Sequence, residues 1–217
     1  MKKNLLFIVI ACFVFHEQAS CQVFAENSNL RGLLNFSRSY FRPDPFRKQF
    51  STFLNLLLND PLIENKILHK RSDTSLFYFS GTYKDYNPFF FKPKQTKILL
   101  QEQVVELSTE SKKTDTIFTY QLITVTDNTS EMLRDIEKEF NKMHRQNKGK
   151  FYNTNHEELK EDGKYTFTIN HYFVYNCALS PLTIGWGKVE GESEAELALT
   201  LRFKMEGNEA VLINCVW

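Results

Sequence analysis

The sequence predicts an α+β domain: a curved antiparallel sheet of about five to six strands, with N-terminal helices and one inserted helix packed on one face. Two observations predict this fold class, and a third indicates the number of domains. Apolar residues recur at helical spacing in two N-terminal segments and again after residue 130. The C-terminal third alternates apolar and polar side chains, as half-buried strands do. The sequence has no internal repeat, coiled-coil heptad or low-complexity tract, which indicates one domain over residues 26–217.

The N-terminus predicts a secretory signal peptide over residues 1–21. Lys2 and Lys3 precede an unbroken apolar run, Leu5–Phe15, and polar residues beginning with His16 end this run. A transmembrane helix needs about 20 apolar residues, so the run is too short to span a bilayer. A buried N-terminal helix of the fold is the alternative.

Three kinds of processing fit this leader. Small residues at Ala19 and Cys21 allow cleavage after Cys21, and Ala25 allows a cut as late as residue 25. The stretch from Gln18 to Cys21 also resembles a bacterial lipoprotein signal, in which Cys21 becomes the lipidated first residue. That resemblance implies membrane anchoring through Cys21. Simple cleavage implies an exported protein of the periplasm, the cell envelope or the extracellular space.

The mature chain is formally neutral, which argues against nucleic acid as a partner. The full chain has 27 basic and 26 acidic residues. Loss of Lys2, Lys3 and Glu17 with the leader removes two basic residues and one acidic residue and leaves 25 of each. No block of basic residues is present to attract a phosphate backbone.

Cys177 and Cys215 are the cysteines in the body of the domain, since Cys12 and Cys21 belong to the leader or its processing site. In an oxidising compartment the pair is a disulfide candidate, and closing a loop of this length would stabilise the fold by about 4 kcal/mol. Two buried free thiols are the alternative. Neither cysteine has a second Cys or His at zinc-binding spacing, so no metal is predicted.

Two helices are expected before residue 61. Apolar spacing indicates the first over residues 29–40. Asp44 is the candidate N-cap of the second, because its carboxylate can accept from the free amides of a first turn, and Pro45 suits the first helical position. Asp60 precedes a proline and is expected to end this helix.

Three strands are expected in the middle of the chain. Aromatic and β-branched residues predict a strand over 76–83, with a bulge or bend at Gly81. Residues 97–107 and 116–126 alternate apolar and polar side chains and are joined by a short polar segment. They predict a hairpin.

The inserted helix is expected directly after this hairpin. Capping residues fill positions 127–130, and apolar residues then follow at helical spacing from Met132 to Met143. Residues 145–163 are polar and rich in turn formers, without an apolar period. They predict a long surface loop.

Long antiparallel strands are expected in the last third. In the strand over 165–176, the odd-numbered, aromatic-rich side chains are predicted to face the core. Residues 194–205 predict a strand with one apolar and one polar face, paired with a strand that runs to the C-terminus. A three-residue loop over 206–208 would pair Phe203 with Val211 and turn the apolar residues of both strands inward.

This order of elements, over Leu30–Trp217, resembles the NTF2-like or cystatin-like cone, in which helices close over the concave side of a bent sheet. The resemblance involves no sequence motif. It implies an apolar pocket on the concave side. Because such cones include both enzymes and binding modules, the resemblance does not decide the function.

The sequence has no motif of known catalytic or cofactor chemistry. The histidines of the domain form no HExxH or HxH pattern, and no nucleophile elbow, Walker loop or dinucleotide fingerprint is present, so no cofactor is predicted. His171 is a candidate site residue, because a place on the aromatic face of its strand would shift its titration by burial. A hydrogen-bonded core histidine is the alternative.

The segment Tyr83–Pro93 is the strongest binding candidate. Three consecutive phenylalanines lie between prolines and cannot all point into one core, so at least one is expected to be exposed or to line a pocket. Packing of this loop against the helices is the alternative. The candidate ligand-binding or partner-binding residues are therefore Tyr83, Tyr86, Phe89, Phe90, Phe91, Tyr120 and His171.

The sequence favours a non-enzymatic, exported or lipid-anchored domain that binds a protein partner or a small apolar ligand. The expected binding surface is the 83–93 loop together with the concave face of the sheet. One alternative is a cone-type enzyme with Tyr120 or His171 in a central acid–base pocket. The other is a structural subunit of an envelope complex.

Overall fold

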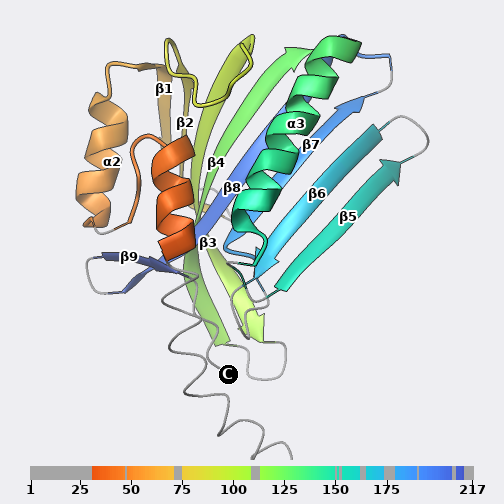
Figure 1. Ribbon diagram of the computed structural model, residues 1–217. Coiled ribbons are helices and arrows are strands. Elements are labelled where there is room, and N and C mark those ends of the chain that lie inside the picture. The colour runs from red at the N-terminus through yellow and green to blue at the C-terminus, as the bar shows by residue number, and fades with distance from the viewer. Residues whose placement is uncertain are drawn as a thin grey trace, which may run out of the picture.

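One large antiparallel sheet forms the framework of the molecule, and helices cover one of its faces (Figure 1). The computed structural model describes residues 31–46, 48–70, 75–108, 113–149, 151, 153–161, 165–173, 179–189, 191–206 and 209–212. The predicted signal peptide, the candidate lipidation site Cys21 and the candidate disulfide pair Cys177 and Cys215 lie outside these residues.

Nine strands make up the described sheet, eight of them in the order β1-β2-β3-β4-β8-β7-β6-β5. The ninth, β9, pairs with β8. Phe203 of β8 pairs with Phe118 of β4 on one side and with Leu212 of β9 on the other, so β9 continues the line of β7. The strands are β1 (Ile63–Lys70), β2 (Ser75–Tyr83), β3 (Gln95–Ser108), β4 (Lys113–Asp127), β5 (Asn153–Glu161), β6 (Tyr165–Phe173), β7 (Leu182–Val189), β8 (Glu194–Glu206) and β9 (Glu209–Leu212).

The class is α+β, but the prediction of about five to six strands is wrong, because the edge strands β1 and β5 and the inner strand β7 were not predicted. Residues 153–161, predicted as a surface loop, form β5 and pair with β6 over their whole length. Leu159 is the only apolar residue of β5 and is exposed. An edge strand with charged side chains needs no apolar alternation, since water reaches it and charge discourages pairing with other chains. β1, at the other edge, was missed as well.

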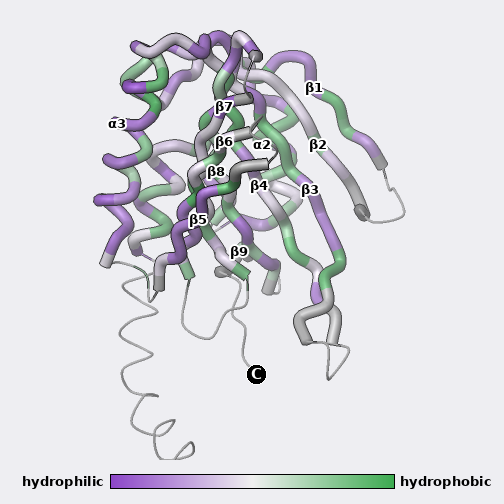
Figure 2. Tube along the Cα trace, turned by 90° about the vertical axis from the view of Figure 1, so that its right-hand side faces the viewer, coloured by the Kyte–Doolittle hydropathy of each residue, from purple (hydrophilic) through white to green (hydrophobic). Residues whose placement is uncertain are grey.

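Three helices are described, and they lie on the same side of the sheet (Figure 1). They span residues 31–40, Phe50–Asn59 (α2) and Ser130–Asn147 (α3). None of the described helices is long and apolar enough to cross a bilayer. In Figure 2 the tube of α3 alternates between hydrophilic and hydrophobic residues, because Ile136, Phe140 and Met143 are buried against the sheet.

The ends of the helices agree in part with prediction. Thr129 caps α3, where its hydroxyl accepts from the Met132 amide at 3.3 Å. α2 ends before Asp60 as predicted, but it begins at Phe50 instead of directly after Pro45. Asp44 does not cap it: the Asp44 carboxylate accepts from the Ser37 hydroxyl at 2.7 Å and so ties this turn to the preceding helix.

The predicted hairpin of β3 and β4 is confirmed. The irregularity expected at Gly81 lies in the neighbouring strand, because the β1 register shifts between Glu64 and Ile67, opposite Gly81. A Cβ on Gly81 would lie 2.5 Å from Cγ2 of Ile63, so this glycine permits the close approach of β1.

The predicted orientation of β6 is wrong. Tyr172 is fully buried and Asn170 is 3 % exposed, whereas His171 is only half-buried. Tyr172 pairs with Leu182 of β7, which is also fully buried, so the even-numbered residues of β6 face the helices. The aromatic-rich face lies on the opposite side of the sheet, where no described helix packs (Figure 1).

The closing hairpin also differs from prediction by one residue. β8 ends at Glu206 and β9 begins at Glu209, so Phe203 pairs with Leu212 instead of Val211. The prediction assumed that the last strand continues alongside Leu201. Leu182 of β7 occupies that place beside Leu201. The apolar face of β8 at Leu201 therefore does not determine the register of β9.

Candidate functional site

The predicted aromatic binding residues are divided between core and surface. Phe89 and Phe91 are buried and Phe90 is 52 % exposed, which confirms that at least one of the three points outward. Tyr83 is buried, and the half-buried Tyr86 donates a hydrogen bond from its hydroxyl to the Tyr40 carbonyl at 3.1 Å. Most of this loop therefore packs against the first helix.

Tyr120 lies inside the filled core. Its side chain is fully buried, and its hydroxyl donates to the carbonyl oxygens of Arg42 and Pro43, each at 3.3 Å. Burial raises the pKa of Tyr120 well above its ordinary value. The ring of Phe53 from α2 packs edge-on at 5.3 Å between centroids.

His171 lies on the face of the sheet opposite the helices. Its Nδ1 is 3.4 Å from Thr183 Oγ1, and its Nε2 is 3.4 Å from a Glu157 carboxylate oxygen. The structure therefore separates His171 from Tyr120 and from the phenylalanine loop, which belong to the helix side.

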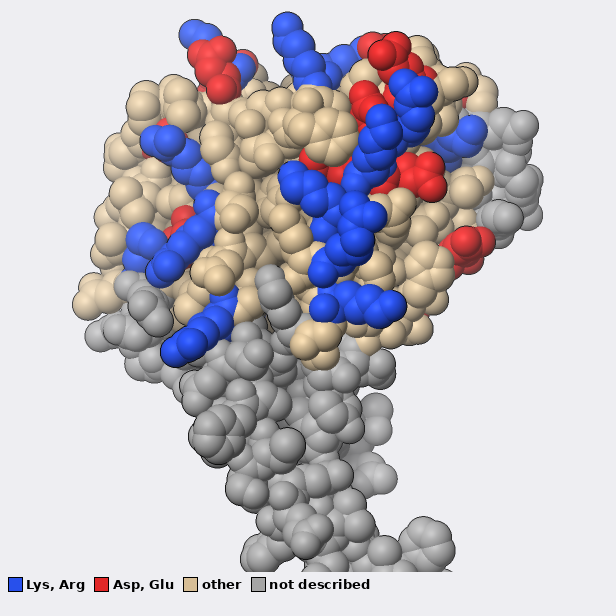
Figure 3. Space-filling model, viewed as in Figure 1, with Lys and Arg blue, Asp and Glu red and all other residues tan. Residues whose placement is uncertain are grey.

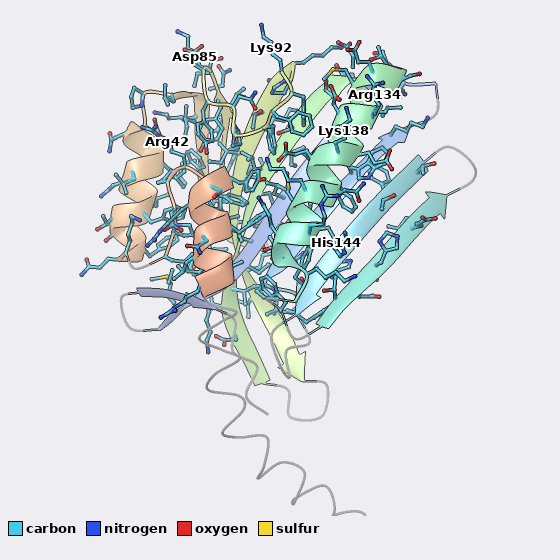
Figure 4. The ribbon with its side chains drawn as sticks, in the orientation of Figure 1. Arg42, Asp85, Lys92, Arg134, Lys138 and His144 are labelled. Carbon is cyan, nitrogen blue, oxygen red and sulfur yellow. The ribbon has the colours of Figure 1, made fainter. Side chains whose placement is uncertain are left out.

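A pocket that the sequence did not indicate lies between the C-terminal half of α3 and the strands β5 and β6. Its volume is about 390 Å³. Figure 4 shows His144 on α3, at the side of the helix that faces these strands. The lining residues are Phe140, Asn141 and His144 of α3, its C-cap Lys148, Thr154 and His156 of β5, and Asn170 of β6.

Asn170 connects the two histidines of this pocket. Its side-chain oxygen lies 2.8 Å from Nδ1 of His156, and its side-chain nitrogen lies 3.3 Å from Nδ1 of His144. The Tyr172 hydroxyl is 3.0 Å from the same His144 nitrogen. Asn170 is almost completely buried, so the bridge is built into the wall between helix and sheet.

The chain matches no known protein family, characterised protein or solved structure. The function is therefore argued from this site. The resemblance to NTF2-like and cystatin-like cones stays a prediction.

The Asn170 amide sets the tautomers of both histidines. An amide oxygen only accepts, so Nδ1 of His156 must carry a proton. The amide nitrogen only donates, so Nδ1 of His144 is the acceptor, and the proton of a neutral His144 is on Nε2. Among the described residues, no hydrogen bond occupies His144 Nε2. A neutral pair therefore offers one N–H donor, from His144, and one acceptor nitrogen, from His156.

Burial lowers the pKa of His144 below its ordinary value of 6.5, and the neighbouring charges of Lys148 and His156 lower it further. Burial also raises the pKa of the Tyr172 hydroxyl, which therefore stays protonated and able to donate. At neutral pH His144 is consequently a neutral imidazole, held by two polar neighbours.

Local structure explains why these residues meet. His144 lies in the last turn of α3 and Lys148 is its C-cap, whose backbone N–H donates to the His144 carbonyl at 2.7 Å. His156 and Asn170 are direct partners across the β5–β6 pair. The sequence contained the helical spacing, but the cross-strand pair was hidden, because β5 was predicted to be a loop.

The lining of the pocket contains no carboxylate. The acidic side chain described nearest to the histidines is Glu158, which lies 3.8 Å from His156 Nε2 and is 61 % exposed. Within the described part of the chain, no group of three or more His, Cys, Asp or Glu side chains could hold a metal ion. Lys148 therefore supplies the only permanent charge of this lining.

A second cavity, of about 510 Å³, lies between the start of α2 and the far ends of β3 and β4. It has the opposite character, because Glu102 and Asp115 line it together with Phe50 and Phe118. Burial raises the pKa of Glu102. No histidine or cation lines this cavity, so the two sites differ in the sign of their charge.

The titration of His144 should show this electrostatic environment directly. We expect its pKa, measured from the imidazole proton shifts by NMR, to lie below 6.5 and to rise in Lys148→Gln, because one repelling charge is removed. In the matched control Lys138→Gln, an exposed lysine earlier on α3, it should not change. An unchanged His144 pKa in Lys148→Gln would contradict this assignment.

The same shift has a consequence for stability. Because the pKa of His144 is lower in the folded state than in the unfolded state, its protonation favours unfolding. Its contribution to stability is therefore complete above about pH 6.5 and is lost as the pH falls through the pKa of the folded state.

Proposed function

We propose that this chain is an exported binding domain whose pocket between α3, β5 and β6 takes a small anionic ligand. The observation that carries the proposal is that His144, whose Nε2 can donate, and the cation Lys148 line one cavity without a lining carboxylate. The signal-like leader of the sequence supports export. The sequence alone favoured an apolar ligand, but Phe140 is the only apolar side chain in this wall.

The size of the pocket fits a small organic anion. Its volume of about 390 Å³ is near the lower end of the range for small-molecule sites. Phe140 supplies an apolar surface for the carbon skeleton, and Lys148 supplies a full positive charge at the rim. Charge-assisted hydrogen bonds from an ammonium group are stronger than hydrogen bonds between neutral groups.

The surrounding surface supports an anionic ligand as well. Basic side chains gather along α3 on the face shown in Figure 3. Clustered charge of one sign raises the local concentration of oppositely charged ligands. α3 carries Arg134, Lys138, Lys142 and Arg145, and Lys148 follows it. The acidic residues of the helix all lie before position 140, so the excess of positive charge is at the end that borders the pocket.

Isothermal titration calorimetry with lactate, propanoate, phosphate and sulfate tests this proposal. We expect at least one of these anions to bind, and we expect Lys148→Gln to weaken binding about tenfold, the effect of losing one charged hydrogen bond. Lys138→Gln removes the same charge from an exposed site on the same helix and should change the affinity by less than about twofold.

Two results would contradict the proposal. One is that none of the four anions binds. The other is that both lysine variants weaken binding equally, which would assign the effect to the general charge of α3 and not to the pocket.

A further inference from the structure

We infer that the ligand of this pocket is an anion that also carries a hydroxyl group, with an anionic oxygen accepting from His144 Nε2 and the hydroxyl donating to His156 Nε2. This inference rests on the proposed function. It specifies the chemical class of the ligand within the small anions.

The first step is the state of His156. Its Nδ1 is 2.8 Å from the Asn170 oxygen, which accepts only. The proton of a neutral His156 is therefore committed to Nδ1, and Nε2 has a lone pair without a proton. A ligand atom that meets this nitrogen must donate a hydrogen bond, and a plain carboxylate or sulfate has no proton to donate.

The second step is the state of His144. Its Nδ1 faces two groups that can donate, the Asn170 amide nitrogen at 3.3 Å and the Tyr172 hydroxyl at 3.0 Å. The proton of the neutral ring is therefore on Nε2, which provides a donor for an anionic oxygen. One buried amide thus gives two chemically identical side chains opposite roles.

The third step is the set of charges around the two rings. At the C-cap of α3, Lys148 follows His144 by four residues, and on β5 the exposed Glu158 lies near His156. The titratable group that β6 turns toward this wall is Tyr172, which stays neutral because it is buried. Lys148 therefore supplies the fixed positive charge, and the two histidines distinguish between anions of equal charge.

Matched ligand pairs test the inference. Lactate and propanoate differ by one hydroxyl group, as hydrogen phosphate and sulfate differ by one proton. By calorimetry at about pH 8, where imidazole groups are neutral, we expect the hydroxylated member of each pair to bind about tenfold more tightly, because the other leaves His156 Nε2 unpaired.

A variant separates this effect from simple loss of structure. The side chain of His156 is 54 % exposed, so His156→Ala removes little packing, although the Asn170 oxygen loses its donor. We expect the ratio of lactate to propanoate affinity to fall to about one in this variant, because the partner of the ligand hydroxyl is gone. His69→Ala, an exposed histidine on the distant β1, should keep the preference.

The outcomes distinguish the two levels of the argument. Equal binding of lactate and propanoate at about pH 8, or a preference that survives in His156→Ala, would overturn the inference and leave anion binding in place. A preference for the hydroxylated member in only one pair would show whether a hydroxy acid or a protonated phosphate is the better representative of the class. Failure of all four anions to bind would overturn the proposed function itself.

Discussion

Replacement of Glu139 by alanine is expected to lower the free energy of unfolding by about 2 to 4 kcal/mol, because two hydrogen-bond donors lose their buried acceptor. Glu139 is completely buried although it lies on α3, and its carboxylate accepts from the Tyr40 hydroxyl at 2.9 Å and from Lys142 at 2.9 Å. The Phe90 amide approaches its second oxygen at 3.4 Å. The side chain thus joins α3 to the first helix and to the phenylalanine loop.

The large effect has a specific cause. Without the carboxylate, the Tyr40 hydroxyl and the Phe90 amide lose their acceptor in a place with little water, and a buried unsatisfied donor is costly. Burial and the neighbouring Glu139 raise the pKa of Tyr40, so this hydroxyl remains a donor and cannot relieve the loss by ionising.

Asp135→Ala is the matched control for this prediction. Asp135 also pairs with a lysine three residues later, Lys138, at 3.0 Å, but this pair is partly exposed. Exposed pairs contribute about 0 to 1 kcal/mol, so its loss should be within that range. Urea denaturation of both variants measures the difference. Equal destabilisation would mean that the Glu139 network does not hold the three segments together.

The second large effect is expected at Gly187, where alanine should destabilise the fold by about 3 kcal/mol or more. A Cβ on Gly187 would lie 2.5 Å from the Thr166 carbonyl oxygen and still closer to the Phe167 ring of the adjacent strand β6. A backbone oxygen in a paired strand cannot move without breaking hydrogen bonds between the strands, so the clash cannot be relieved at low cost in free energy.

Gly185 provides the control, since it lies on the same face of β7 two residues earlier. A Cβ there would lie 3.3 Å from a side-chain carbon of Ile169, which can shift by a few tenths of an ångström. Gly185→Ala should therefore cost less than about 1 kcal/mol in the same urea experiment. A Gly187→Ala variant as stable as Gly185→Ala would show that β6 and β7 are less closely paired than described.

The sequence predicted the parts of the fold that bury an apolar stripe. The hairpin of β3 and β4 and the helix α3 have long periodic patterns and clear caps, and both were found. β5 has no such pattern, because an edge strand exposes its side chains to water and depends on main-chain pairing with β6. Its absence from the prediction made the expected sheet too small.

The error at β6 shows why alternation alone does not identify the inner face. Both faces of this strand carry large side chains, and the aromatic-rich one was assigned to the core. The face beneath α3 instead holds Tyr172 and Asn170, whose polar atoms are satisfied by His144 and His156. Polar residues can be buried where a partner is present, and the partner came from elements far away in the sequence.

The candidate site could not be predicted, because it depends on β5 and on the orientation of β6. Its polar side chains come from the end of α3, from β5 and from β6, and only those at the end of α3 are close together in the sequence. The aromatic residues that the sequence did single out are mostly packing residues, apart from the exposed Phe90.

The position of β5 at the margin of the sheet has a dynamic consequence. One wall of the pocket is a strand with a single neighbour, and local opening of such a margin costs less free energy than unfolding of the whole domain. Transient detachment of β5 from β6 would admit or release a ligand while the core of the protein stays folded. The rate at which β5 opens, measured by amide hydrogen exchange, would then set an upper limit on how fast a ligand leaves by this route.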